Sequence, residues 1–315
     1  FMGLEFYENV QWSRTLEVMH GESGTPWQYR LFTESLVYVT VQTFDALGVP
    51  RPISVAFVLI RLIQNTLTFS LALVFYKKLG ISIMEGILGI TLLAFGMCHA
   101  LYDGDLTFNT YTDLSIFLAA GLLILDRRFL WLIPLTFIGA FNRETSGCIP
   151  FMLLISQLKL KPRPHISRKI LIIFFTCLGI WIIIIAGMRL PFVFGSRPYI
   201  VPTAGKSPIL PLLIFNLTWW RTWVYLFGTL GLMPLLALSS WSAWPSELRR
   251  LFWAIVPIWF PVHFAFAHAP ETRLFLVPQV LIFIPGALIG MKIFSQQLEY
   301  NLDPTAKSKH PSDFS

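Results

Sequence analysis

The stretch that decides the fold runs from Tyr102 to Cys148 and reads YDGDLTFNTYTDLSIFLAAGLLILDRRFLWLIPLTFIGAFNRETSGC. It begins with an acidic loop, crosses an apolar segment to a basic corner at 126–128, and ends on Asn142-Arg143-Glu144-Thr145 with apolar sequence on both sides. A charge at the centre of a membrane helix costs on the order of 3 kcal/mol. Such residues usually face a protein interior or a water-filled cavity. We therefore interpret the acidic loop and residues 142–145 as two walls of one site.

The composition is that of a polytopic membrane protein. The chain has 315 residues, of which 55% are hydrophobic and 13% charged, whereas a soluble domain carries about 25% charged residues. The fold class predicted is an all-α transmembrane helix bundle in a lipid bilayer. The net charge of +7 does not indicate nucleic acid as a partner, because the basic residues cluster in short loops between apolar runs, where they encode topology.

Most apolar runs are long enough to span a bilayer. The predicted spans are 53–76, 81–101, 109–125, 170–188, 251–267 and 274–293, with 209–238 as an interfacial piece followed by a span. Residues 130–141 and 146–158 are each too short to cross a core of about 30 Å. We expect one transmembrane domain over 1–294, in which 1–30 form an external amphipathic helix, and a disordered cytoplasmic tail over 295–315.

The distribution of basic residues predicts the topology. Lys77-Lys78, Arg127-Arg128, the 159–169 loop, Arg249-Arg250 and the tail are placed in the cytoplasm. This arrangement works only if 130–158 enters and leaves on the same side, which favours a re-entrant pair of helices with residues 142–145 at its turn. The external face then collects 1–30, 103–105, 189–208 and 268–273. We expect a multi-pass protein of a bacterial inner membrane with its site on the periplasmic side.

Two carboxylates lie close together in the acidic loop. Asp103 and Asp105 flank a glycine, and paired carboxylate oxygens suit a hard divalent cation such as Mg²⁺ or Mn²⁺. The alternative is an exposed polar turn. Asp113 begins the following helix and can favour its N-terminus.

Arginines and acids near the apolar runs are the other candidates. Arg143 can bind an anionic head group while Glu144 orients it, and the alternative is an ion pair that holds two short helices together. Arg273, which follows Glu271, can bind phosphate or interfacial lipid. The alternatives for His268 are a proton carrier and a polar side chain that only packs against its neighbours. Arg61 with Gln64 and Asn65 forms a polar seam.

The pattern resembles the GT-C membrane glycosyltransferases, which take a sugar from a polyprenyl-phosphate carrier. The resemblance rests on short motifs: a surface segment from Pro26 to Arg30, the acidic second external loop, the 142–145 turn, and Glu271-Thr272-Arg273 before a proline-containing span. It implies a GT-C-like bundle whose substrate-binding residues are Arg30, Asn142, Arg143, Glu144, His268, Glu271 and Arg273. The acceptor would be a glycan, lipid or protein.

The resemblance also implies a catalytic base in the first external loop, usually an aspartate after the first transmembrane helix. This chain has no aspartate before Asp45, so Glu8 or Glu5 takes that role, and the helix that should precede the loop is not seen. Asp103 and Asp105 match a pair that binds metal in some family members, and Asp103 is a further catalytic candidate. Other members work without metal.

Two readings of a different class stay open. The chain could be a non-catalytic integral subunit of a larger membrane complex, whose buried charges only hold helices together. It could also be a transporter or lipid flippase, although its cytoplasmic side offers mainly basic loop residues.

Overall fold

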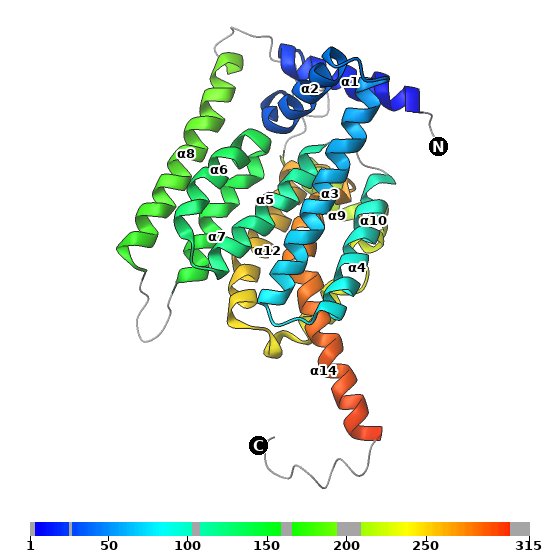
Figure 1. Ribbon diagram of the computed structural model, residues 1–315. Helices are drawn as coiled ribbons and strands as arrows, with labels where there is room; N and C mark the ends of the chain where they lie inside the picture. The colour runs from blue at the N-terminus through cyan, green and yellow to red at the C-terminus, as the bar shows by residue number, and fades with distance from the viewer. Residues whose placement is uncertain (1–3, 25–26, 103–107, 159–165, 194–208, 303–315) are drawn as a thin grey trace.

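A computed structural model describes residues 4–24, 27–102, 108–158, 166–193 and 209–302 (Figure 1). All regular structure in these residues is helical, which confirms the predicted all-α class for this part of the chain. The α-helices are α1 (Leu4–His20), α2 (Leu31–Ala46), α3 (Pro52–Lys78), α4 (Ile83–Tyr102), α5 (Phe108–Leu125), α6 (Leu132–Asn142), α7 (Cys148–Gln157), α8 (Arg168–Val193), α9 (Ile209–Thr218), α10 (Trp220–Leu230), α11 (Met233–Ser239), α12 (Ser246–Phe266), α13 (Leu276–Pro278) and α14 (Ile284–Leu302). Short helical turns are η1 (Trp27–Tyr29), η2 (Phe129–Trp131), η3 (Glu144–Gly147), η5 (Trp241–Ala243), η6 (Thr272–Phe275) and the π-helix η7 (Gln279–Phe283).

Among the described residues, five helices are long and apolar enough to cross a membrane. They are α3, α4, α5, α8 and the run Thr272–Gln296 that ends in α14. Helices α10 and α11 add a sixth if they are taken as one span, bent by 67°. The chain is therefore a multi-pass membrane protein, as its composition predicts.

The spans divide into central and peripheral helices. About 78% of the α5 span and 83% of the Thr272–Gln296 span is buried inside the protein, compared with 22% of α3. Polar residues of α5 and of the last span therefore face other helices, whereas much of α3 is left to face lipid. This difference explains how the centre of the bundle can hold charged side chains.

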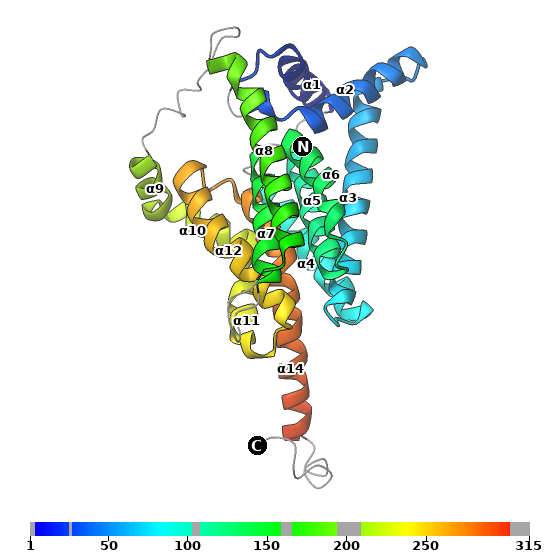
Figure 2. The same ribbon diagram turned by 90° about the vertical axis from the view of Figure 1, so that its left-hand side faces the viewer.

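Helices α6 and α7 form the short hairpin predicted for 130–158. They run in opposite directions beside α8 and are joined by η3 (Figures 1 and 2). Their outer ends lie at the same end of the bundle, since Arg127, Arg128 and Lys169 line one surface pocket. Arg250 donates a 2.8 Å hydrogen bond to the carbonyl of Ser156 at this end. Both outer ends of this segment therefore lie at one end of the bundle, which is the arrangement that the predicted hairpin requires.

The opposite end of the bundle is covered by α1 and α2, away from the end of α14 (Figure 1). The two helices are joined by a 2.8 Å hydrogen bond from the Thr15 hydroxyl to Oε2 of Glu34 and by stacking of Trp12 on Tyr38. Glu34 is buried, so this acidic residue of α2 faces protein. In the described residues, α1 thus lies at the end of the bundle opposite the pocket lined by Arg127, Arg128 and Lys169.

Close backbone approach fixes α14 against the segment around α11. A Cβ placed on Gly286 would collide with the ring of Trp244, and the Trp244 indole donates a 3.1 Å hydrogen bond to Ser240. Ser240 in turn contacts the carbonyl of Gly286 at 3.0 Å. Only glycine permits this packing, which is typical of helix contacts in membranes.

Two boundaries differ from the sequence-based expectation. Helix α14 continues to Leu302, so the residues just after 294 are helical and not a disordered tail; 303–315 lie outside the described residues. The 251–267 segment forms most of α12 but is not among the five spanning helices, because α12 begins on polar and charged residues at Ser246.

Candidate functional site

A break between α6 and α7 places the polar residues 142–145 at the end of the hairpin. Helix α6 ends at Asn142, Arg143 is extended with φ −165° and ψ 147°, and η3 begins at Glu144. A Cβ on Gly139 would lie 2.9 Å from the Cβ of Ser146, so the two arms of the turn are in close contact. The turn therefore directs the side chains of 142–145 toward the neighbouring helices α2 and α5.

Asp113 of α5 anchors this turn. Its Oδ2 lies 3.8 Å from NH1 of Arg143 and accepts a 2.7 Å hydrogen bond from the Thr145 hydroxyl. The Asp113 side chain is fully buried and that of Arg143 is 6% exposed. Such charges are tolerated inside a protein only when they are paired and hydrogen-bonded. Because α5 begins at Phe108, the interpretation of Asp113 as a helix-start residue is wrong.

Glu144 turns the other way and meets Arg30, which directly precedes α2. The Nε of Arg30 lies 3.8 Å from Oε2 of Glu144, whose side chain is 24% exposed. Burial lowers the pKa of Arg30 from 12.5 to about 10; Glu144 opposes this shift, while Arg143 and Arg273 add to it. Arg30 therefore remains a cation at neutral pH. The guanidinium groups of Arg143 and Arg273 are close enough for their charges to act on it.

Arg273 in η6 completes a group of three arginines. Its NH2 lies 2.6 Å from Oε2 of Glu271. The indole of Trp27 lies against both Arg30 and Arg273. The guanidinium of Arg30 is 4.4 Å from the ring centre, and that of Arg273 is 5.5 Å from it. Cation–π contacts of this kind fix the guanidinium plane while its N–H groups point outward in that plane.

A buried hydrogen-bond network holds the break in place. The Thr33 hydroxyl of α2 donates a 2.5 Å bond to Oδ1 of Asn142. The Asn142 amide donates a 3.0 Å bond to the carbonyl of Asn109 in α5. Asn142 thus ties the hairpin to two other helices at the point where the charged residues begin.

The site contains three cations and three anions. We call Arg30, Arg143, Arg273, Asp113, Glu144 and Glu271 the charged cluster. Its members come from four separate parts of the chain, and their formal charges sum to zero. Two of the carboxylates, those of Glu144 and Glu271, are partly exposed, at 24% and 37%. The three arginine side chains are less exposed, at 6–9%.

The structure brings together six of the seven residues assigned to substrate binding. These are Arg30, Asn142, Arg143, Glu144, Glu271 and Arg273. His268 lies elsewhere, with its ring stacked 5.4 Å from that of Phe215 in α9. Arg143 and Glu144 do not pair with each other, as one alternative supposed; Arg143 pairs with Asp113 of α5, and Glu144 pairs with Arg30, which precedes α2.

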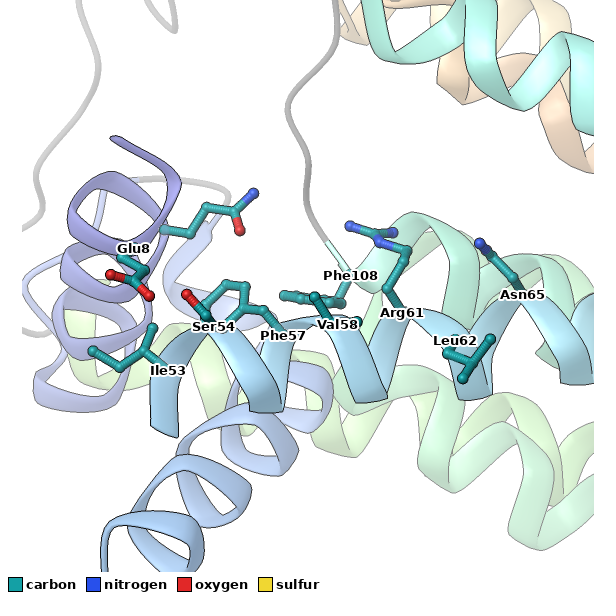
Figure 3. A pocket seen from close by; sticks show the side chains of 10 residues that line it. Glu8, Ile53, Ser54, Phe57, Val58, Arg61, Leu62, Asn65 and Phe108 are labelled. Carbon is teal, nitrogen blue, oxygen red and sulfur yellow. The ribbon is translucent and has the colours of Figure 1, made fainter. Parts of the chain in front are cut away.

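Glu8 lines a separate cavity of about 470 Å³ between α1 and α3 (Figure 3). Arg61 and Asn65 line the same cavity, and none of its lining residues belongs to the charged cluster. The side chain of Glu5, and Asp103 and Asp105 entirely, lie outside the described residues. No group of three or more potential metal ligands among His, Cys, Asp and Glu occurs in the part of the chain that the structure describes.

Sequence reasoning missed Trp27, Thr33 and His263. His263 in α12 is buried, its Nδ1 lies 2.8 Å from the carbonyl of Trp259, and the charges of Arg143 and Arg30 act on it. Asp113 carried a usable signal, because a carboxylate inside a predicted span usually has a specific partner. Trp27 and Thr33 carried none, since their roles depend on which helices meet.

Comparisons with protein-family models, curated proteins and solved structures find no match for this chain.

Proposed function

We propose that this chain is a membrane glycosyltransferase that uses a polyprenyl-phosphate-linked sugar and binds the phosphate of that donor at Arg30, Arg143 and Arg273. The observation that carries the proposal is the meeting of these three arginines, from η1–α2, α6–η3 and η6, within the charged cluster. Guanidinium groups recognise phosphate through several parallel hydrogen bonds. A lipid-linked donor arrives sideways from the bilayer, so its phosphate needs cations held among membrane helices.

Glu144 is the general base in this proposal. A base must lie within hydrogen-bond reach of the hydroxyl that it deprotonates, and that hydroxyl attacks the sugar carbon bonded to the phosphate. Glu144 belongs to the charged cluster, is partly exposed, and has one carboxylate oxygen, Oε1, without a hydrogen-bond partner among the described residues. Glu8, which the family resemblance assigns to this role, lines another cavity.

The acceptor oxygen forms a bond to the anomeric carbon as the bond from that carbon to the phosphate oxygen breaks. The acceptor proton passes to the Glu144 carboxylate, and polyprenyl phosphate leaves with the electron pair of the broken bond. The three arginines stabilise the charge that develops on the leaving phosphate.

Binding of polyprenyl monophosphate tests the phosphate site without knowledge of the sugar. The purified full chain should retain polyprenyl monophosphate at least tenfold better than the uncharged polyprenol, measured by native mass spectrometry. Arg143→Gln or Arg273→Gln should each weaken this binding about tenfold or more, since a hydrogen bond to a charged group is worth about 1.5–3 kcal/mol. Arg168→Gln, at the exposed start of α8, is the matched control and should bind like the wild type. Equal retention of the two lipids would overturn the proposal.

Catalysis requires a second measurement. Glu144→Gln should lower the release of polyprenyl phosphate from sugar-loaded donors about 100-fold or more, while its binding of polyprenyl monophosphate stays within about threefold of wild type.

The balanced charge of the cluster also favours a second candidate, a non-catalytic subunit in which the ion pairs only join helices. In that case the wild type would show no preference for the phosphate, and the arginine variants would change thermal stability alone.

A further inference from the structure

The cavity between α1 and α3 has the arrangement of polar groups expected of a specific lipid site, separate from the charged cluster. Its volume is about 470 Å³, within the range of small-molecule sites. One wall is α1 with Glu8, the other is α3, and Phe108 at the start of α5 closes the inner side (Figure 3). Its lining includes no member of the charged cluster, so a ligand bound here does not depend on the proposed function.

Three polar groups in this cavity have no internal partner. Oε1 of Glu8, Oγ of Ser54 and Oδ1 of Asn65 are buried without a hydrogen-bond partner among the described residues. A buried polar atom left unpaired destabilises the protein by about 1–3 kcal/mol, so several such atoms in one cavity are unusual. A bound ligand with polar groups would provide their hydrogen-bond partners.

Arg61 provides a cation in the same cavity. Its guanidinium lies 4.5 Å from the ring centre of Phe108 and 4.2 Å from that of Tyr111. These stacking contacts use the faces of the guanidinium and hold its plane in a fixed orientation. Arg61 therefore offers an oriented positive charge on the helix that is least buried of the five spans.

The cavity opens toward the bilayer. Val58 and Leu62, which line it on α3, are 62% and 61% exposed. In a multi-pass protein such exposed apolar side chains on a spanning helix face lipid chains. A ligand can therefore enter sideways and leave its hydrocarbon part outside.

The polar groups are ordered along the axis of α3 like the parts of a phospholipid head group (Figure 3). Glu8 lies beside Ser54 near the start of α3, with Arg61 and then Asn65 further along (Figure 3). Along a helix, Ser54 and Arg61 are about 10 Å apart and Arg61 and Asn65 about 6 Å. From the start of α3 onward, the order is thus an anion, a cation and a neutral amide.

We propose that this cavity binds a phospholipid with a primary amine in its head group, as in phosphatidylethanolamine. The ammonium group meets the Glu8 carboxylate, the phosphate meets Arg61, and the Asn65 amide meets the glycerol ester region. A head group with no positive charge would leave Glu8 unpaired beside an anion. A trimethylammonium group would neutralise Glu8 but has no N–H to donate to Oε1 or to the Ser54 hydroxyl.

Lipid retention by the purified full chain tests this assignment. Native mass spectrometry with dioleoyl-phosphatidylethanolamine, dioleoyl-phosphatidylglycerol and dioleoyl-phosphatidylcholine should show at least fivefold preference for the first. Glu8→Gln should bring ethanolamine and glycerol lipids to within about twofold of each other. Glu17→Gln, on the same helix but exposed, is the matched control and should keep the wild-type preference.

Arg61 is tested in the same assay. Arg61→Gln should lower retention of all three lipids at least fivefold, whereas Arg168→Gln should leave it unchanged. If Arg61→Gln fails to fold, Asn65→Leu replaces it and should lower retention of the ethanolamine lipid at least threefold. Equal retention of the three lipids by the wild type, a preference for the glycerol lipid, or an unchanged preference in Glu8→Gln would each overturn the proposal.

Discussion

Arg143 and Asp113 form a buried ion pair between the α6–α7 break and the central helix α5, with 3.8 Å between NH1 and Oδ2. The Thr145 hydroxyl donates to the same carboxylate oxygen. Asp113 thus holds Arg143 and Thr145, the residues on either side of Glu144, and in this way it sets the position of Glu144. Helix α5 therefore fixes the position of the α6–α7 break, which contributes Arg143 and Glu144 to the charged cluster.

Removing the negative charge of Asp113 should destabilise the protein strongly. Asp113→Asn keeps a carbonyl oxygen for Thr145 but leaves Arg143 as an uncompensated buried cation, which costs about 3–5 kcal/mol. We expect a clear loss of thermal stability in detergent. The double variant Asp113→Asn/Arg143→Gln should recover much of that loss. If the double variant is as unstable as the sum of the single variants, the two side chains do not interact.

Thr33→Val should loosen the break without changing side-chain volume. The substitution removes the 2.5 Å hydrogen bond to Asn142 and should cost about 1 kcal/mol of unfolding free energy. Thr43→Val is the matched control, because Thr43 on the same helix is exposed and its hydroxyl donates to the backbone carbonyl of Val39. The two variants can be compared by thermal unfolding; equal effects would mean that the Asn142 contact contributes nothing.

Gly286→Ala should be much less stable than Gly187→Ala. The added Cβ collides with Trp244 at the first position and meets open space at the second, in α8. Overpacking typically costs about 1–3 kcal/mol, whereas alanine in an open helix position is neutral or stabilising by about 0.5–1 kcal/mol. Unfolding temperatures of both variants check this difference, and a tolerant Gly286→Ala would show that α14 can move away from Trp244.

Cysteine labelling in intact membranes checks the hairpin. In a background without Cys98, Cys148 and Cys177, the variants Arg128→Cys and Arg168→Cys should react with a membrane-impermeant maleimide from the same side. Glu22→Cys, exposed next to the end of α1, should react from the opposite side. Labelling of positions 128 and 168 from different sides would mean that α6 and α7 together cross the membrane once.

Much of the architecture follows from local sequence features. The length and composition of the apolar runs predict most of the spans, and the two runs of 130–141 and 146–158 are too short to cross alone. The positions of Lys77-Lys78, Arg127-Arg128 and the 159–169 loop then require the hairpin. The polar motif 142–145 marks the place where a break must occur, because charged residues inside apolar sequence need protein partners.

The pairing of those residues was decided only by the tertiary structure. The sequence suggests that adjacent Arg143 and Glu144 form an ion pair. The backbone at Arg143 is extended, however, and Arg143 pairs with Asp113 of α5 while Glu144 pairs with Arg30, which precedes α2. Likewise, the sequence placed Glu8 beside the other acids on one membrane face, but the crossing of α1 over α3 gives it a cavity with Arg61. Hydrophobicity is a property of each segment and can be read along the chain, whereas a charge finds its partner through helix packing, which depends on the whole bundle at once.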